Sequence, residues 1–233
     1  MSIVKTEAFV LKSFKYGETS KIVTLFTKDF GKINAIVKGA RNYKSKLCGT
    51  LETMNYINVI IYVKENRELQ LVTGAEYKNS FSSIITDFDK LETAYRIIEI
   101  LNRSLTGSEI NQPVFKLLLE TYSKLNTSIK NFSCYLLYFQ IRLTKIMGLD
   151  PDLSEINSDN ETFFDKKEFY FNKTMLYPLQ LISQNKIENI EHIDIDQKSL
   201  SGLIHRYDKY LSHHTHGYRN YKTAKVFEEI NIS

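Results

Sequence analysis

Apolar and polar positions alternate with a period of two in the first third of the chain, which predicts half-buried β-strands. Two apolar runs, at 22–26 and 33–37, flank the turn Lys28-Asp29-Phe30-Gly31, where Gly31 supplies the dihedral angles that a short hairpin loop needs. Three further strands are expected at 5–14, 55–63 and 68–73. Five strands in about eighty residues favour an OB-fold barrel over an immunoglobulin-like sandwich, which usually needs ~100 residues.

After Phe81 the apolar positions recur with the period of a helix, which predicts a domain boundary near residue 80. Asp87 is expected to cap one helix, Pro113 to begin a second, and Gly148 to end a third. Further helices are expected after Asp196 and over 221–230.

The segment 152–178 interrupts the helices with a polar sequence and two short aromatic runs, Phe163-Phe164 and Phe169-Tyr170-Phe171. This pattern predicts a small hairpin inserted between helices. Together the patterns predict an α+β multidomain fold, with an OB-fold β-barrel at 1–80 followed by an α-helical domain at 81–233.

Positive charge is concentrated in the first third of the chain. The formal net charge is +4, but residues 1–80 hold thirteen Lys and Arg against seven Asp and Glu. The remaining residues hold 18 basic and 20 acidic side chains and are close to neutral. Such asymmetry is typical of a module that binds a polyanion. The candidate DNA-binding residues in and beside the basic stretch are Lys21, Lys28, Lys32, Lys38, Arg41, Lys44 and Lys46.

Tyr43 lies inside the basic stretch and is the best-placed aromatic residue for stacking on a base, with Tyr16 and Phe30 as further candidates. Stacking is worth ~1–3 kcal/mol per base. Packing inside a small β-domain is the more common role of such rings. The basic residues likewise have a simpler interpretation, as a solvated face that keeps a strand edge from aggregating.

A second basic cluster near the end of the chain comprises Arg206, Lys209, Arg219, Lys222 and Lys225. Solvated helix faces explain this cluster adequately. The functional alternative is a secondary contact with DNA or with the acidic tail of a protein partner.

The chain offers little of the chemistry that enzymes and metal proteins use. Its two cysteines, Cys48 and Cys134, cannot form a four-cysteine metal site, and Cys134 is expected to pack as a small core residue. His213, His214 and His216 follow the end of a helix, where the helix dipole favours histidine without a metal. The sequence has no P-loop and no spaced set of carboxylates, so no catalytic residue and no enzyme activity are predicted.

The first residues lack the apolar core of a signal peptide, and no apolar run approaches the ~20 residues of a membrane span. A reduced, cytoplasmic protein is therefore expected.

A resemblance to the RecO family of bacterial recombination mediators is carried by residues 9–47, FVLKSFKYGETSKIVTLFTKDFGKINAIVKGARNYKSKL. There the Gly-Glu before a strand, the Thr-Leu-Phe-Thr, the turn glycine and the Lys-Gly-Ala-Arg follow the order of that family. The resemblance returns at residues 147–151 and in YDKYLSHHTHGYRNYKTAKVF near the end of the chain. It spans the chain from end to end, although the middle helices are generic.

The resemblance implies an N-terminal OB-fold and a helical domain. It also implies binding of single- and double-stranded DNA, annealing of complementary strands, and binding of RecR. With RecR, members of the family help RecA replace single-strand DNA-binding protein on gapped DNA. The implied protein is a bacterial, cytoplasmic monomer that associates with the nucleoid during repair.

Many members of the family carry a small zinc finger within the helical part. This chain departs from that pattern, because its segment 152–178 contains no cysteine where many relatives have four zinc ligands. We therefore expect no zinc and no other cofactor, with the hairpin held by its phenylalanines instead.

Two other functions fit the same residues. The barrel of a non-catalytic adaptor would contact an acidic protein partner and never touch DNA, whereas a metal-dependent nuclease would use the terminal histidines. Salt-dependent retention on single-stranded DNA separates DNA binding from the adaptor. Cleavage of labelled DNA in the presence of manganese or magnesium would identify the nuclease.

Overall fold

The computed structural model describes residues 2–45, 47–64, 67–107, 109–151, 162–164, 169–171, 173–215 and 222–232. The chain divides into two compact units, each of which is described by itself. The barrel unit comprises Met1–Phe81 and Leu105–Phe115, and the helical unit comprises Ser82–Ser104 and Lys116–Ser233. The segment 105–115, which joins two helices in sequence, thus belongs with the strands.

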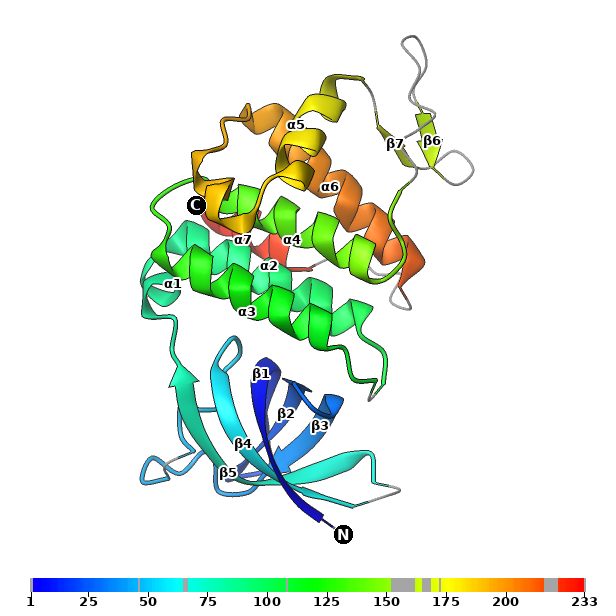
Figure 1. The fold of residues 1–233 in the computed structure, drawn as a ribbon. Coiled ribbons are helices and arrows are strands. Elements are labelled where there is room, and N and C mark those ends of the chain that lie inside the picture. The colour runs from blue at the N-terminus through cyan, green and yellow to red at the C-terminus, as the bar shows by residue number, and fades with distance from the viewer. Residues whose placement is uncertain are drawn as a thin grey trace. The chain divides into compact units, whose positions relative to one another are not determined.

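Five strands close into a barrel in the order β1-β2-β3-β5-β4 (Figure 1). Neighbouring strands run antiparallel except β3 and β5, which pair in parallel. This five-stranded Greek-key barrel has the arrangement of an OB-fold, so the predicted fold class is confirmed. The strands are β1 (Ser2–Tyr16), β2 (Ser20–Thr27), β3 (Gly31–Val37), β4 (Tyr56–Val63) and β5 (Leu69–Asn79).

Strand β1 is longer than the stretch 5–14 expected from the pattern, because it pairs with two neighbours. Its first half pairs with β4 and its second half with β2. The register with β2 shifts between Val10 and Lys12, so Leu11 forms a bulge. The amide of Met54 donates to the carbonyl of Val10 (2.8 Å), and the amide of Val10 donates to the carbonyl of Asn55 (3.0 Å). Bulges of this kind bend a strand so that it can leave one neighbour and join another.

The barrel interior is filled by the inward positions of each strand. Strand β3 shows the predicted alternation most clearly, because its odd-numbered residues from Gly31 to Val37 are buried while the residues between them are more exposed. On the outer face, the ring of Phe9 stacks on Tyr56 with centroids 4.7 Å apart and contacts Phe115 at 5.6 Å. Phe115 lies in the part of α3 that belongs to the barrel unit, so this helix start covers one part of the barrel surface.

The helical unit is built around α4, whose sequence is apolar on nearly every side. Every side chain between Cys134 and Thr144 is buried except that of Arg142, and α4 packs against α2, α5 and α6. Such all-round apolar character is typical of a helix in a core. The helices are α1 (Ser82–Thr86), α2 (Phe88–Ser104), α3 (Gln112–Thr127), α4 (Phe132–Ile146), α5 (Lys173–Gln184), η1 (Ile187–His192), α6 (Gln197–His214) and α7 (Lys222–Ile232).

The predicted helix starts are confirmed by their caps. The carboxylate of Asp87 accepts from the amides of Asp89 and Lys90, at 3.0 and 3.1 Å, and Asp196 accepts from the amide of Ser199 at 2.9 Å. A side-chain acceptor at this position satisfies amides that the helix itself leaves unpaired.

The inserted hairpin is present but is shorter than the segment 152–178. Strands β6 (Thr162–Phe164) and β7 (Phe169–Phe171) pair in antiparallel fashion with Phe163 opposite Tyr170. The end of the segment is helical, because α5 already begins at Lys173 and includes Pro178. The contacts of the hairpin's phenylalanine side chains lie outside the described residues.

The start of α7 is held by a carboxylate on α2. The amides of Lys222 and Thr223 each donate to Glu99 at 2.8 Å, and Arg103 donates to the same carboxylate. Burial by itself would raise the pKa of Glu99, but these donors and the charge of Arg103 hold it below its usual value. Further along α7, the ring of Phe227 packs on Phe88 at 5.1 Å.

Replacing Glu99 with Gln should weaken the attachment of α7 and lower the free energy of unfolding by ~1.5–3 kcal/mol, the usual range for a hydrogen bond to a charged group. The pKa of Glu99 is lower in the folded chain than its usual value of 4.5. Its contribution is therefore present above the unfolded pKa and is lost as the pH falls through the folded pKa. Urea denaturation at a series of pH values measures both effects.

Glu120→Gln is the matched control, because Glu120 lies on α3 and faces Lys116 at 3.7 Å in a pair exposed to solvent. Surface pairs of this kind contribute ~0–1 kcal/mol. Equal losses in the two variants would show that Glu99 does not hold α7.

Candidate nucleic-acid interface

The connection between β3 and β4 begins with an exposed, positively charged segment. Within this basic loop, defined here as residues 38–45, Lys38, Arg41, Tyr43 and Lys44 are all exposed. Tyr43 is 81% exposed, and the Nζ atom of Lys44 lies 5.5 Å from the centroid of its ring. The loop thus presents three cations and one aromatic ring to solvent. Lys46, which was predicted with them, lies outside the described residues.

The basic loop is anchored to the turn between β1 and β2. The amide of Arg41 donates to the carbonyl of Thr19 at 2.9 Å, and its Nη1 donates to the carbonyl of Gly17 at 2.6 Å. Gly17 and Gly39 both have φ values in the left-handed region, +57° and +69°, which glycine adopts without strain. These bonds tie the loop to the end of β1, where Tyr16 is 51% exposed. The loop is therefore a positioned part of the barrel surface.

The second half of β1 adds residues that the sequence interpretation missed. Lys12, Phe14 and Lys15 are exposed on this strand, and the Nζ atom of Lys12 lies 5.3 Å from the centroid of the Phe14 ring. The alternation in Lys12-Ser13-Phe14-Lys15-Tyr16 is the signal that could have identified them, since it places Lys12, Phe14 and Tyr16 on one face.

Lys21 has a structural role in the barrel. It is only 9% exposed and forms an ion pair with Glu52, in the second part of the β3–β4 connection. This contact occupies its ammonium group at a buried position, and a contact of Lys21 with DNA stays a prediction.

Lys28 and Lys32 lie at the opposite end of the β2–β3 hairpin from the basic loop. Six residue steps along β3 separate Lys32 from Lys38, which corresponds to about 20 Å of extended strand. The Nζ atom of Lys28 lies 3.9 Å from Glu7, which also accepts hydrogen bonds from Lys78 and Tyr56. Burial would raise the pKa of Glu7, but its hydrogen bonds and the two lysine charges hold it below its usual value. The predicted basic residues therefore form two separate groups.

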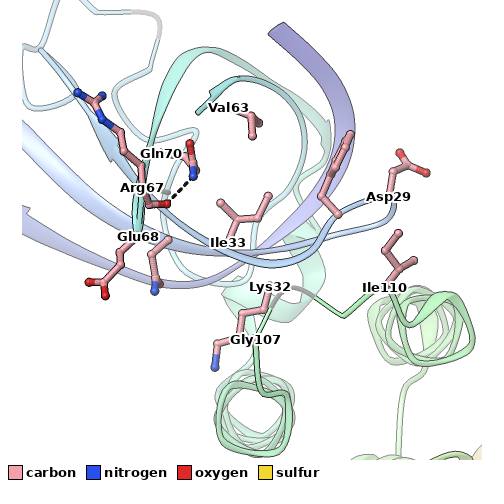
Figure 2. Close-up of a pocket in the computed structure, with 11 residues that line it drawn as sticks. Asp29, Lys32, Ile33, Val63, Arg67, Glu68, Gln70, Gly107 and Ile110 are labelled. Atoms are coloured by element: carbon pink, nitrogen blue, oxygen red, sulfur yellow. Dashed lines mark hydrogen bonds between the residues drawn. The ribbon is translucent and has the colours of Figure 1, made fainter. Parts of the chain in front are cut away.

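Lys32 lines a pocket of ≈ 520 Å³ within the barrel unit (Figure 2). Its Nζ donates to the carbonyl of Leu105 at 3.0 Å, and burial lowers its pKa. Phe30 also lines this pocket and packs against the barrel core, so its ring is less available for stacking than that of Tyr16 or Tyr43. The described lining holds two cations and two carboxylates, so its formal charges balance, and a contact of Lys32 with DNA stays a prediction. It is lined by Asp29, Phe30, Lys32, Ile33, Asn34, Val63, Arg67, Glu68, Gln70, Gly107 and Ile110.

The second basic cluster is described only in part. Arg206 is half-buried and its Nη1 donates to the carbonyl of Gly202 at 3.1 Å, while Lys222 is exposed at the start of α7. Arg219 and the side chain of Lys225 lie outside the described residues. A secondary contact at this cluster therefore stays a prediction.

Within the part of the chain that the structure describes, no three His, Cys, Asp or Glu side chains are grouped as a metal site. The Nδ1 atom of His214 is hydrogen-bonded to the carbonyl of Tyr210 at 2.9 Å, and His216 is not among the described residues. Cys134 is buried, as predicted, and burial raises its pKa to about 11, whereas Cys48 is exposed. That the protein binds no zinc stays a prediction. Among the described helices, none has the length and apolar character to cross a membrane.

Two family models match the chain. The description "Recombination protein O N terminal" covers residues 1–81 and "Recombination protein O C terminal" covers residues 85–222. The protein named DNA repair protein RecO from Chloroherpeton thalassium is 25% identical over 98% of this chain and 99% of its own length.

Proteins with the same name from Chlorobium limicola and Prosthecochloris aestuarii are 38% and 40% identical. Those two matches cover 65% and 66% of this chain, and in each case 58% of the relative. The chain thus matches little more than half the length of these two relatives, whereas the match to the Chloroherpeton protein is nearly complete.

The burial of Lys21 yields a test of its structural role. Replacing Lys21 with Met should lower the free energy of unfolding by ~1–2 kcal/mol, because the variant loses a charge-assisted contact to Glu52. Replacing the exposed Lys38 with Met should change it by less than ~0.5 kcal/mol. Urea denaturation of the two variants makes the comparison, and a Lys21 variant as stable as the Lys38 variant would contradict the structural role.

Proposed function

Because the chain belongs to the RecO family of DNA repair proteins, we propose that its barrel unit binds single- and double-stranded DNA and promotes annealing of complementary strands. The observation that carries this proposal is the basic loop, which exposes Lys38, Arg41 and Lys44 and is anchored to the β1–β2 turn through Arg41. The usual site for nucleic acids on an OB-fold is the surface of strands 2 and 3 with the loops between strands 1 and 2 and between strands 4 and 5. The basic loop is bonded to the first of these loops through Arg41.

The interaction is electrostatic and independent of base sequence. Lys and Arg side chains that neutralise phosphates release condensed counterions, which makes binding weaken as salt is added. The logarithm of the binding constant falls against the logarithm of salt concentration by about 0.7 per neutralised phosphate on a single strand, and by about 0.9 on a duplex. A loop with three exposed cations fits this mode of binding.

Annealing follows from the same charge. Two complementary strands repel each other through their phosphates. The Lys and Arg side chains of the barrel lower that repulsion, and by holding both strands they raise the local concentration of DNA. This mechanism breaks no covalent bond and requires no cofactor. The proposed role is therefore that of a non-catalytic mediator.

The proposed partners are RecR, RecA and single-strand DNA-binding protein. In this proposal, the protein acts with RecR on DNA that single-strand DNA-binding protein covers, and it helps RecA to load there. The helical unit would supply protein-binding surface. The exposed Lys222 is one candidate contact for an acidic tail, together with Arg206, Arg219 and Lys225.

Neutralising two residues of the basic loop tests the DNA-binding site. The double variant Lys38→Gln/Lys44→Gln should bind single- and double-stranded DNA more weakly. Its salt slope, the fall of the logarithm of the binding constant against the logarithm of salt concentration, should be smaller by about 1.4 on a single strand if both lysines contact phosphates. Arg41 is left in place because it anchors the loop to Gly17. Fluorescence anisotropy of labelled oligonucleotides at several salt concentrations measures the slope.

Lys5→Gln is the matched control, since Lys5 is also an exposed barrel lysine but lies on the half of β1 that pairs with β4, 3.8 Å from Glu76. It should leave the slope unchanged. An unmodified chain whose DNA retention does not depend on salt would favour the adaptor and exclude this proposal. Cleavage of the labelled strand in magnesium or manganese would instead point to the nuclease.

A further inference from the structure

A row of mostly apolar side chains crosses the barrel from strand to strand. Phe14 on β1 is paired with Ile22 on β2, and Ile22 is paired with Ile36 on β3. The row continues through the parallel pair of Ile36 with Leu71 on β5, and through the pair of Leu71 with Tyr62 on β4. Directly paired residues of neighbouring strands lie on the same face of the sheet. The apolar row is therefore Phe14, Ile22, Ile36, Leu71 and Tyr62.

The apolar row points out of the barrel. Its sequence neighbours Val23, Ala35 and Val72 belong to the buried core, and successive side chains of a strand point to opposite faces. Phe14 is 43% exposed, and the other members of the row are half-buried. Adjacent strands lie about 4.8 Å apart, so the three positions on β1, β2 and β3 form a strip roughly 10 Å long.

Cations border the β1 end of this strip. Lys12 lies two residues before Phe14 on the same face, with its Nζ atom 5.3 Å from the ring centroid. Tyr16 lies two residues after Phe14, next to the turn at Gly17 that binds Arg41 of the basic loop. An apolar strip with cations along its border complements a ligand that exposes flat apolar faces and negative charge together.

We propose that the part of the apolar row on β1, β2 and β3 binds the unpaired bases of single-stranded DNA, with Phe14 as the stacking platform. This inference rests on the proposed function and names the form of DNA that the barrel prefers. Lys12 and the basic loop hold phosphates while bases lie on Phe14, Ile22 and Ile36. Aromatic side chains bind bases in this way without regard to sequence, because every base has a π-face.

The apolar row contributes nothing to duplex binding. In a duplex each base is stacked between its neighbours, so its flat faces are not available to a side chain on the protein surface. Phosphate contacts are available in both forms of DNA. The basic loop therefore supports both forms, and the row adds affinity for the single strand only.

A tryptophan reporter tests the proposal directly, because the chain contains no Trp. In the full-length variant Phe14→Trp, stacking of a base on the indole should quench its fluorescence. Adding an oligothymidine strand should reduce the emission, and adding a duplex of the same length should leave it unchanged. Tyr177→Trp, at an exposed position on α5, is the control and should respond to neither.

Affinity measurements on the variant Phe14→Ala are the second test of the stacking proposal. The variant should bind the single strand roughly 5- to 150-fold more weakly, the range for loss of one stacked base, and should bind the duplex as before. Phe14→Leu keeps an apolar contact with Ile22 and removes only the ring, so it repeats the test if the alanine variant unfolds.

The outcomes distinguish failure of the stacking proposal from failure of the proposed DNA binding by the basic loop. Loss of single-strand affinity in the Phe14 variants together with selective quenching supports the stacking row. Unchanged single-strand affinity, or equal losses on both forms of DNA, would overturn it. If the Lys38→Gln/Lys44→Gln variant still shows its smaller salt slope, the proposed function survives that failure. If neither set of variants affects binding, both proposed contact sites are wrong.

Discussion

The pairing of β1 with two neighbours at once is the constraint on which the rest of the barrel depends. One strand closes the sheet by joining β4 through its first half and β2 through its second. The bulge at Leu11, braced by hydrogen bonds between Val10 and the end of the β3–β4 connection, allows the change of direction. The same bulge determines that Lys12, Phe14 and Tyr16 face outward. Closure of the barrel and composition of its outer face therefore have one cause.

Lysines with similar positions in the sequence have different roles in the barrel. Lys21 is buried against Glu52. Lys32 lines a pocket and donates to the carbonyl of Leu105. Lys38 and Lys44 are exposed on a loop that Arg41 anchors. Among these described residues, the exposed group combines accessible charge with a position fixed through Arg41, which is what phosphate binding requires. The proposed site thus contains fewer basic residues than the first third of the chain does.

The strands and helices could be predicted because their signals are local. An apolar run marked β2, alternation marked β3, and the caps at Asp87 and Asp196 marked helix starts. The faces occupied by individual lysines could not be predicted, because their partners are distant in sequence. Glu52 lies 31 residues from Lys21, and Leu105 lies 73 residues from Lys32. Phe14 and Lys12 were missed because the predicted strand ended at Phe14, whereas β1 continues to Tyr16 and bulges at Leu11.

The central claim is that the outer face of the barrel near the β1–β2 turn, together with the basic loop, holds DNA. Hydrogen–deuterium exchange of the full chain, with and without an oligothymidine strand, measures which backbone amides the DNA protects. We expect slower exchange in the peptides that contain residues 12–24 and 34–45. Protection confined to the helical unit, with unchanged exchange in those two segments, would contradict the claim.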